Sequence, residues 1–393
     1  MKSVLEGVTV LDMSRFIAGP YCAAMLADFG ARVIRVERVG GGEDRQLLAV
    51  TEGAGTVFLQ MNRNKESLTL EVTQPEGAEV FRRLVLASDV VVQNLPPRVL
   101  RKLGQDYETL SKINTRIILA NISAFGTVGP RRDHLGLDGI AQAVSGAVFM
   151  GGDAQQPVKA AASYADFGTG LAAAFGVMAA LMERAKTGRG QLVEASLLAT
   201  ALAFFSPHLI EQAVASTNRT PQMNRSQIAS PADVYRTCDG WIIVQILGHD
   251  MFTRWTRAVG ADALATDPDF ASDTLRVKNA DRLGRVMSAW CADRRSEDAV
   301  AGLQRANIPA AEVMSPQQVL DDPHVLASGL LQEVGYPGLP VDPPLVAPPV
   351  LLSETPGTIR NRAPLPGEHT DGILRWLGYA DGEIERLRAT SVV

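Results

Sequence analysis

Residues 8–37, VTVLDMSRFIAGPYCAAMLADFGARVIRVE, decide the fold class. The run Val8–Asp12 is short, apolar and rich in β-branched residues, which is typical of a buried strand. A helix is predicted over residues 19–29, because proline suits a helix start and a glycine follows its end. The next predicted strand is Arg32–Glu37. The stretch therefore indicates a strand, a helix and a second strand.

The same alternation continues outward from this stretch. Further strands are predicted at Ser67–Val72, Asp89–Val92 and Arg116–Leu119, and an amphipathic helix begins at Pro75. Strands separated by helices of this length favour an α/β fold with a doubly wound, parallel, Rossmann-like sheet. No GxGxxG motif follows the first strand, and residues 186–191 hold Lys and Gly in the wrong order for a phosphate loop. A nicotinamide or nucleoside-triphosphate enzyme is therefore disfavoured.

A second, smaller α+β region is expected after about residue 217. Residues 233–244 predict two strands joined by an Asp-Gly hairpin turn, and mostly helical patterns follow to residue 306. Residues 337–356 contain seven prolines, so we expect an extended strap there that forms neither helix nor strand. A small helix over 371–377 closes the chain.

Composition limits the function classes. The chain of 393 residues has a net charge of −5 and scattered Lys and Arg, so we expect no nucleic-acid partner. Its three cysteines form no CxxC pair, which indicates neither a disulfide framework nor a metal site. The start lacks a signal-peptide pattern, and the longest apolar run, near residues 171–182, is too short to cross a bilayer. We therefore expect a cytoplasmic protein without membrane contact.

One acidic residue, Asp166, stands in the stretch YADFGTG, residues 164–170, just before the apolar run. The simple interpretation is a helix N-cap, since aspartate is common there. The alternative is a working group, because a carboxylate shielded from water can serve as a nucleophile or as an acid or base. Gly168 and Gly170 would let backbone N–H groups approach the oxyanions that form.

Several short motifs together resemble one family, the class III (CaiB/BaiF-type) CoA-transferases. This group includes formyl-CoA transferase, the carnitine CoA-transferase and the 2-methylacyl-CoA racemases. The matching pieces keep the family's order and spacing over about 370 residues. They are residues 5–12, Ala18-Gly19-Pro20, residues 26–31, residues 33–37, Asn64-Lys65, Leu103-Gly104, residues 141–143, residues 186–191 and Gly367-Glu368-His369-Thr370.

The resemblance implies that Asp166 is the catalytic nucleophile. CoA would move from an acyl-CoA thioester to a carboxylic acid through an aspartyl anhydride and an aspartyl-CoA thioester. Acyl-CoA and CoA would be substrates rather than tightly bound cofactors, and the reaction would need no metal.

The resemblance also carries over a CoA site. The family's adenine- and phosphate-contacting positions fall on Arg38, Leu70, Asn94 and Lys102, and Arg98 would share one helix face with Lys102. A family lysine is replaced by Thr73, so the phosphate contacts must differ in detail.

The substrate positions point to a larger, more apolar acyl group than formate or oxalate. They are Ile17, which replaces a glutamine of formyl-CoA transferase, together with Leu137 and Asp138. The racemase alternative needs a histidine directly before Asp138, where Leu137 cannot move protons. His134 and His249 lie near the two missing racemase partners, and we interpret both as surface residues. A non-catalytic CoA-binding protein of the same fold is the third alternative.

The family architecture completes the expectations. A large CoA-binding catalytic domain would combine residues 1–215 and 325–393, and residues 220–320 would form the small domain. Residues 321–360 would be the proline-rich return segment. The resemblance implies an interlocked homodimer with the active site at the domain interface.

Overall fold

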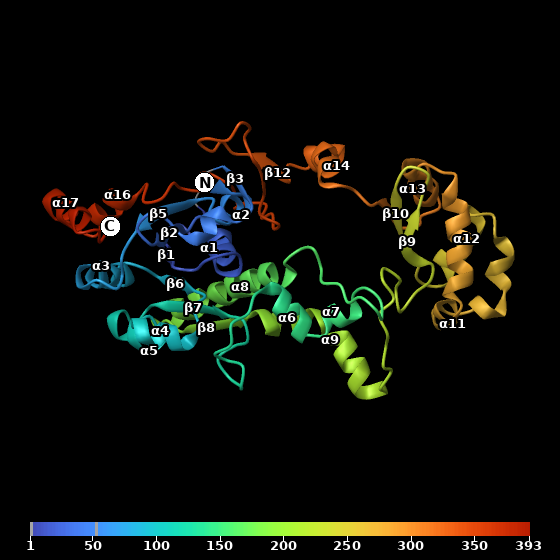
Figure 1. The fold of residues 1–393 in the computed structure, drawn as a ribbon, viewed down its shortest axis with the longest axis horizontal. Helices are drawn as coiled ribbons and strands as arrows, with labels where there is room; N and C mark the ends of the chain where they lie inside the picture. Colours follow the sequence, from blue (N-terminus) through green and yellow to red (C-terminus); the bar gives the residue numbers. More distant parts are fainter. Residues whose placement is uncertain (1–2, 52–53) are drawn as a thin grey trace. The chain divides into compact units, whose positions relative to one another are not determined.

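The computed structural model describes residues 3–51 and 54–393. The chain divides into two compact units (Figure 1). Unit 1 comprises residues 1–147, 160–216 and 326–393, and unit 2 comprises residues 148–159 and 217–325. The domain boundaries given above stay a prediction.

Unit 1 is built around a parallel sheet of six strands in the order β5-β2-β1-β6-β7-β8. Two small antiparallel pairs, β3-β4 and β12-β13, accompany it. Its strands are β1 (Thr9–Asp12), β2 (Arg32–Glu37), β3 (Ala49–Thr51), β4 (Ala54–Gly55), β5 (Lys65–Thr69), β6 (Val90–Gln93), β7 (Ile118–Ser123), β8 (Leu192–Ser196), β12 (Leu331–Glu333) and β13 (Pro344–Val346). Its helices are α1 (Ala18–Asp28), η1 (Glu43–Gln46), α2 (Thr56–Met61), α3 (Pro75–Leu86), α4 (Pro97–Leu103), α5 (Tyr107–Ile113), α6 (Asp138–Val144), α8 (Tyr164–Thr187), α9 (Leu197–Ala215), α16 (Thr370–Trp376) and α17 (Asp381–Ala389).

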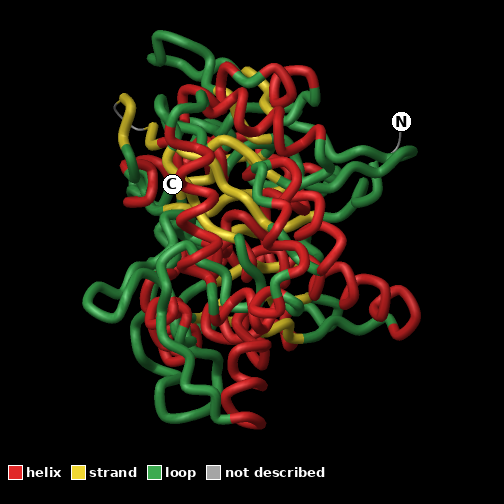
Figure 2. Tube along the Cα trace, turned by 90° about the vertical axis from the view of Figure 1, so that its right-hand side faces the viewer, coloured by secondary structure: helices red, strands yellow, loops and turns green. Residues whose placement is uncertain are grey.

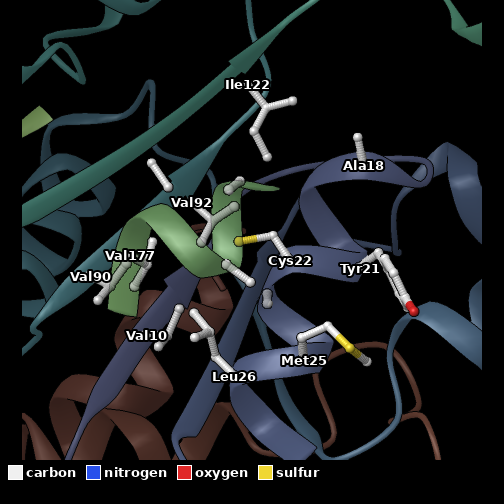
Figure 3. Packing of buried hydrophobic residues seen from close by; sticks show 14 of the residues in the cluster. Val10, Ala18, Tyr21, Cys22, Met25, Leu26, Val90, Val92, Ile122 and Val177 are labelled. Atoms are coloured by element: carbon white, nitrogen blue, oxygen red, sulfur yellow. The ribbon is translucent and has the colours of Figure 1, made fainter. Parts of the chain in front are cut away.

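Helices pack against both faces of this sheet. Figure 2 shows the strands, helices and loops of the chain in separate colours. On one face, α1 and α8 pack on Val10, Val90 and Val92, with Cys22 and Val177 fully buried between them (Figure 3). On the other face, α3, α5, α16 and α17 enclose a second apolar cluster. The predicted α/β fold with a parallel sheet is confirmed.

Unit 2 holds a three-stranded antiparallel sheet and helices around a core that includes Trp255, Phe252 and Met287. The predicted hairpin over residues 233–244 is confirmed by the antiparallel pairing of its two strands. The elements are β9 (Ala232–Arg236), β10 (Trp241–Gln245), α10 (His249–Ala258), η2 (Asp262–Thr266), η3 (Pro268–Phe270), α11 (Asp273–Lys278), α12 (Ala280–Ala292), α13 (Ser296–Arg305), β11 (Ala310–Glu312) and α14 (Pro316–Asp321). Helices α7 (Ala147–Met150) and α15 (Pro323–Ala327) lie where the chain passes between the units.

Three expectations about local structure are wrong. The proline-rich stretch contains a strand, β13, because proline is tolerated in a short edge pair where its missing N–H is not needed. The C-terminal tail has a second helix, α17, which buries Ile384 and Leu387. The apolar run belongs to a 24-residue helix, α8, and both α8 and α9 are long and apolar enough to cross a membrane by length and composition alone. Core helices of soluble proteins meet the same criterion, and the buried face of α8 lies in the core of unit 1.

Candidate active site

The site of unit 1 lies at the carboxyl ends of the parallel strands, where the strand order reverses between β1 and β6. Open α/β sheets bind their ligands at such a switch point. The chain leaves β1 through Arg15 and Phe16, and Asn94 follows β6. The Asn94 amide ties the two exits together, because its Oδ1 accepts from the Arg15 N–H at 3.0 Å and its Nδ2 donates to the Arg15 carbonyl at 2.6 Å.

Phe16 has a positive φ of 70°. This backbone conformation is uncommon for a residue with a side chain, and such residues cluster at functional sites. The Phe16 N–H donates to Asp44 at 3.3 Å, which helps to hold the turn in this conformation. The β1–α1 loop therefore holds a defined conformation where it lines the candidate site.

Two cavities open beside this loop. The first, the Arg38 cavity, has a volume of about 230 Å³ and is lined by Arg38 and Leu70 together with Arg15 and residues of β2. The second, the Leu137 cavity, has a volume of about 350 Å³. Asn94 and Leu137 line it, again with Arg15. The structure thus groups four of the predicted site residues around two neighbouring cavities.

Buried ion pairs form the floor of the Arg38 cavity. Arg35 pairs with Asp44 at 2.7 Å and Glu37 pairs with Arg45 at 2.6 Å, so both residues of β2 hold η1 in place. Burial favours the neutral form of Glu37, but Arg45 and Arg35 outweigh it and lower the pKa of Glu37 to about 2. Charges fixed in this way keep the cavity wall rigid when a ligand is absent.

The remaining predicted residues lie at different depths. Arg98 and Lys102 are exposed on α4, as their predicted shared helix face requires, but neither lines the two cavities. Ile17 is half-buried at the start of α1 and packs against the core, so it lines neither cavity. Asp138 is only 7% exposed at the first turn of α6. Its carboxylate accepts hydrogen bonds from backbone N–H groups of α8 and lines neither cavity, and its predicted contact with the substrate stays a prediction.

Asp166 lies inside α8, at the third helical position, with Ser163 as the N-cap residue. The N-cap interpretation of Asp166 is therefore wrong. Among the residues that the structure describes, no hydrogen bond or ion pair reaches its carboxylate. Burial raises the pKa of Asp166 to about 7, with a further contribution from the negative charge of Asp138. A carboxylate in this condition is basic and weakly solvated, as a nucleophile or a general base requires.

The two glycines beside Asp166 have a packing role. A Cβ on Gly168 would lie 2.7 Å from the Phe204 ring, and one on Gly170 would lie 2.7 Å from the Ala18 carbonyl. Both glycines therefore let α8 approach α9 and α1 closely. The expectation that they let backbone N–H groups approach an oxyanion stays a prediction.

Most residues of the Leu137 cavity were not predicted as site residues, among them Arg15, Phe16 and Arg132. Their signal in the sequence is weak, because Arg15 and Phe16 differ from other loop residues only in following a strand, and Arg132 lies in the middle of a long loop. His134, interpreted above as a surface histidine, also lines this cavity. Among the described residues, no group of three or more His, Cys, Asp or Glu is placed to hold a metal ion.

A parallel α/β sheet with two cavities beside its switch point is typical of a ligand-binding enzyme, and the comparisons with known proteins narrow this class. Asp166 on α8 lines neither of the two cavities. The family model of CoA-transferase family III matches residues 5–370. The chain belongs to this family, and it is a class III CoA-transferase.

Curated relatives match over nearly the whole chain. The succinyl-CoA–L-malate CoA-transferase beta subunit of Chloroflexus aurantiacus is 33% identical over 99% of this chain and 98% of its own length. The formyl-CoA:oxalate CoA-transferase of Rhodopseudomonas palustris is 32% identical, with coverages of 98% and 96%. The succinyl-CoA:glutarate CoA-transferase of Mus musculus is 30% identical, with coverages of 99% and 90%.

Solved structures show the same fold. A CAIB/BAIF family protein from Brucella suis superposes with a TM-score of 0.85 at 28% identity, covering 96% of this chain and all of that one. The orthorhombic form of Rv3272 from M. tuberculosis gives a TM-score of 0.84 at 26% identity, with coverages of 95% and 99%.

Proposed function

We propose that this enzyme transfers CoA from succinyl-CoA, or a related acyl-CoA, to a carboxylic acid, with Asp166 as the nucleophile. The observation that carries this proposal is the state of Asp166, which is partly buried, whose carboxylate lacks a hydrogen-bond partner among the described residues and whose pKa is raised to about 7. Four of the relatives are named for succinate or succinyl-CoA with malate, citramalate or glutarate. These names support a dicarboxylate as the acceptor.

The donor half-reaction has two steps. An Asp166 oxygen attacks the thioester carbonyl carbon, the C–O bond forms, and the C–S bond breaks to release CoA as a thiolate. The thiolate then attacks the Asp166 carboxyl carbon of the mixed anhydride. The donor acid leaves as a carboxylate, and an aspartyl-CoA thioester remains.

The acceptor half-reaction reverses these steps. The acceptor carboxylate attacks the aspartyl thioester and releases the thiolate, which attacks the acceptor's carbonyl carbon. The products are a new acyl-CoA and a free Asp166 carboxylate. Exclusion of water protects the anhydride from hydrolysis, which suits the burial of Asp166.

The CoA moiety would occupy the two cavities of unit 1. The Arg38 cavity suits the adenine end, since Arg38 can stack on a base or pair with a phosphate and Leu70 offers an apolar surface. The Leu137 cavity leads toward α6 and suits the pantetheine arm. Arg98 and Lys102 on the exposed face of α4 would attract the phosphates as the ligand approaches.

We further propose that the enzyme works as a homodimer in the cytoplasm. Helices α8 and α9 expose large apolar side chains, including Phe175 at 77%, Phe204 at 60% and Ile210 at 63%. A second copy of the chain would cover them, and the family resemblance suggests an interlocked arrangement. Mixing two differently tagged preparations tests this, because interlocked subunits should not exchange under native conditions.

Trapping the acylated carboxylate tests the mechanism. The enzyme is incubated with succinyl-CoA and then with hydroxylamine, and the peptide that contains Asp166 is analysed by mass spectrometry. We expect a hydroxamate on Asp166 that is absent without the donor and absent in Asp166→Asn. No adduct with any acyl-CoA, together with α-proton exchange of a 2-methylacyl-CoA in deuterated water, would overturn the proposal in favour of the racemase alternative.

A further inference from the structure

The N-terminus of α8 is capped by a side chain from α6. The Oδ1 atom of Asp138 accepts from the Ala165 N–H at 2.9 Å and from the Asp166 N–H at 3.2 Å. The N-cap residue Ser163 makes no side-chain capping bond. Asp138 therefore occupies two of the backbone donors that a helix N-terminus offers to an anion.

Asp138 is itself fixed. Its Oδ2 accepts from Gln142 Nε2 at 2.6 Å, and Gln142 Oε1 accepts from the Ala160 N–H at 3.0 Å. Asp138 and Gln142 are both almost fully buried, with 7% and 1% exposure. The Asp138 carboxylate is thus held in one position by partners on both sides.

The electrostatic surroundings of Asp166 are simple. Among the described residues, Asp138 on α6 is the charged group whose field acts on it. Tyr164 on α8 itself and Tyr21 on α1 are phenols whose pKa values burial raises, so both are neutral at physiological pH. The α9 residues Thr200 and Phe204, which contact this end of α8, do not titrate in this range.

We propose that Asp138 is a positioning residue for the transfer reaction, which holds the α8 N-terminus and whose fixed negative charge favours the acylated, neutral forms of Asp166. This inference rests on the proposed role of Asp166 as the nucleophile. Two like charges share this end of α8 while Asp166 is ionised, and acylation of Asp166 removes one of them. The repulsion is therefore released in the anhydride and in the aspartyl-CoA thioester.

The repulsion between Asp138 and Asp166 also makes the Asp166 carboxylate more basic. It contributes to the raised pKa of Asp166 in the free enzyme, and a more basic carboxylate is a better nucleophile. Asp138 also withholds two N–H groups that would otherwise stabilise the charge of Asp166. The buried Asp138 side chain thus both fixes the start of α8 and repels the negative charge of Asp166.

The test is the pH dependence of kcat/KM in Asp138→Asn. This variant keeps an Oδ1 acceptor for the two N–H groups and removes the charge. We expect the acid limb of the profile to move to lower pH by about one unit. The ratio of variant to wild-type kcat/KM should therefore rise up to about tenfold between pH 8 and pH 5.

A second variant keeps the proposal testable if Asp138→Asn fails to fold. In D138N the new amide faces the Gln142 amide donor, and the double variant D138N/Q142E restores a donor–acceptor match there while moving the charge away from the α8 N-terminus. We expect it to fold like the wild type and to keep its acid limb below the wild-type position. Asp106→Asn is the matched control, because Asp106 also caps a helix, α5, by accepting from the Thr109 N–H at 3.1 Å.

The outcomes separate this inference from the proposed function. An acid limb at the wild-type pH in both variants, or an equal shift in Asp106→Asn, would overturn the role of Asp138. If the wild type still forms the Asp166 adduct in that case, the transferase mechanism stands. Absence of the adduct in the wild type would instead refute the nucleophile, and the inference would fall with it.

Discussion

Replacing Asp166, the proposed nucleophile, by asparagine, its neutral isostere, should stabilise the protein. The pKa of Asp166 in the folded chain is about 7, against an ordinary value of 3.8. Above pH 7 the Asp166 carboxylate is ionised in the folded state, so the full loss in the free energy of unfolding is present. As the pH falls from 7 toward 3.8, Asp166 takes up a proton in the folded state before it does so in the unfolded state, and this loss of stability disappears. A difference of about three units at about 1.4 kcal/mol each sets an upper bound of about 4 kcal/mol.

The measurement is urea denaturation of the wild type and Asp166→Asn at pH 8 and pH 5. Residual solvent contact reduces the bound, so we expect the variant to be more stable by about 3 kcal/mol at pH 8 and by about 1 kcal/mol at pH 5. Glu194→Gln, which neutralises an exposed carboxylate on β8, should show no such difference. Equal stabilities of Asp166→Asn and the wild type at pH 8, or a gain independent of pH, would refute the idea that burial controls this group.

Three further outcomes follow from the geometry of unit 1. Arg38→Ala should raise KM for acyl-CoA about tenfold and leave kcat within about twofold, because Arg38 lines a cavity away from Asp166; steady-state kinetics would contradict this if kcat fell while KM held. Lys65→Met should lower the free energy of unfolding by about 3–5 kcal/mol, since Asp12, its fully buried partner at 2.6 Å, loses its counter-charge. The pair D12N/K65M should recover most of that loss in the same denaturation assay. Gly190→Ala should leave little folded protein by circular dichroism, because the added Cβ would overlap the Ile117 carbonyl.

Local sequence patterns predicted much of the sheet. The predicted bounds Arg32–Glu37 coincide with β2, and the first predicted strand overlaps β1. These strands are largely buried, and the β-branched residues that they hold are enough to reveal them, although β2 also carries the buried Arg35 and Glu37. The strand predicted over Ser67–Val72 instead occupies Lys65–Thr69. Lys65 is the reason that the start of this strand was predicted two residues too late. A lysine with a buried counter-ion occupies a position where an apolar residue is expected.

The candidate site was only partly predictable. Asp166 was found through family motifs, but its position inside α8 was missed, since Gly168 and Gly170 weaken the helix pattern. The close approach of helices α9 and α1 to α8 leaves no room for a side chain at these two positions, and this packing joins segments that are distant in the sequence. The Asp138 cap joins residues 27 and 28 positions apart, a separation that local propensity does not report.

A carboxylate that must attack a thioester meets two opposing demands. It has to be poorly solvated to react, yet it must remain ionised near neutral pH, and a pKa of about 7 satisfies both. Burial inside the first turn of α8 alone would leave the helix N–H groups free to stabilise the charge and reduce its reactivity. Asp138 accepts from two of those groups, so the helix start has its hydrogen bonds while the charge of the proposed nucleophile, Asp166, is not stabilised by them. In the proposed mechanism, the destabilisation of the resting enzyme and the reactivity of Asp166 toward an acyl-CoA thus have the same physical origin.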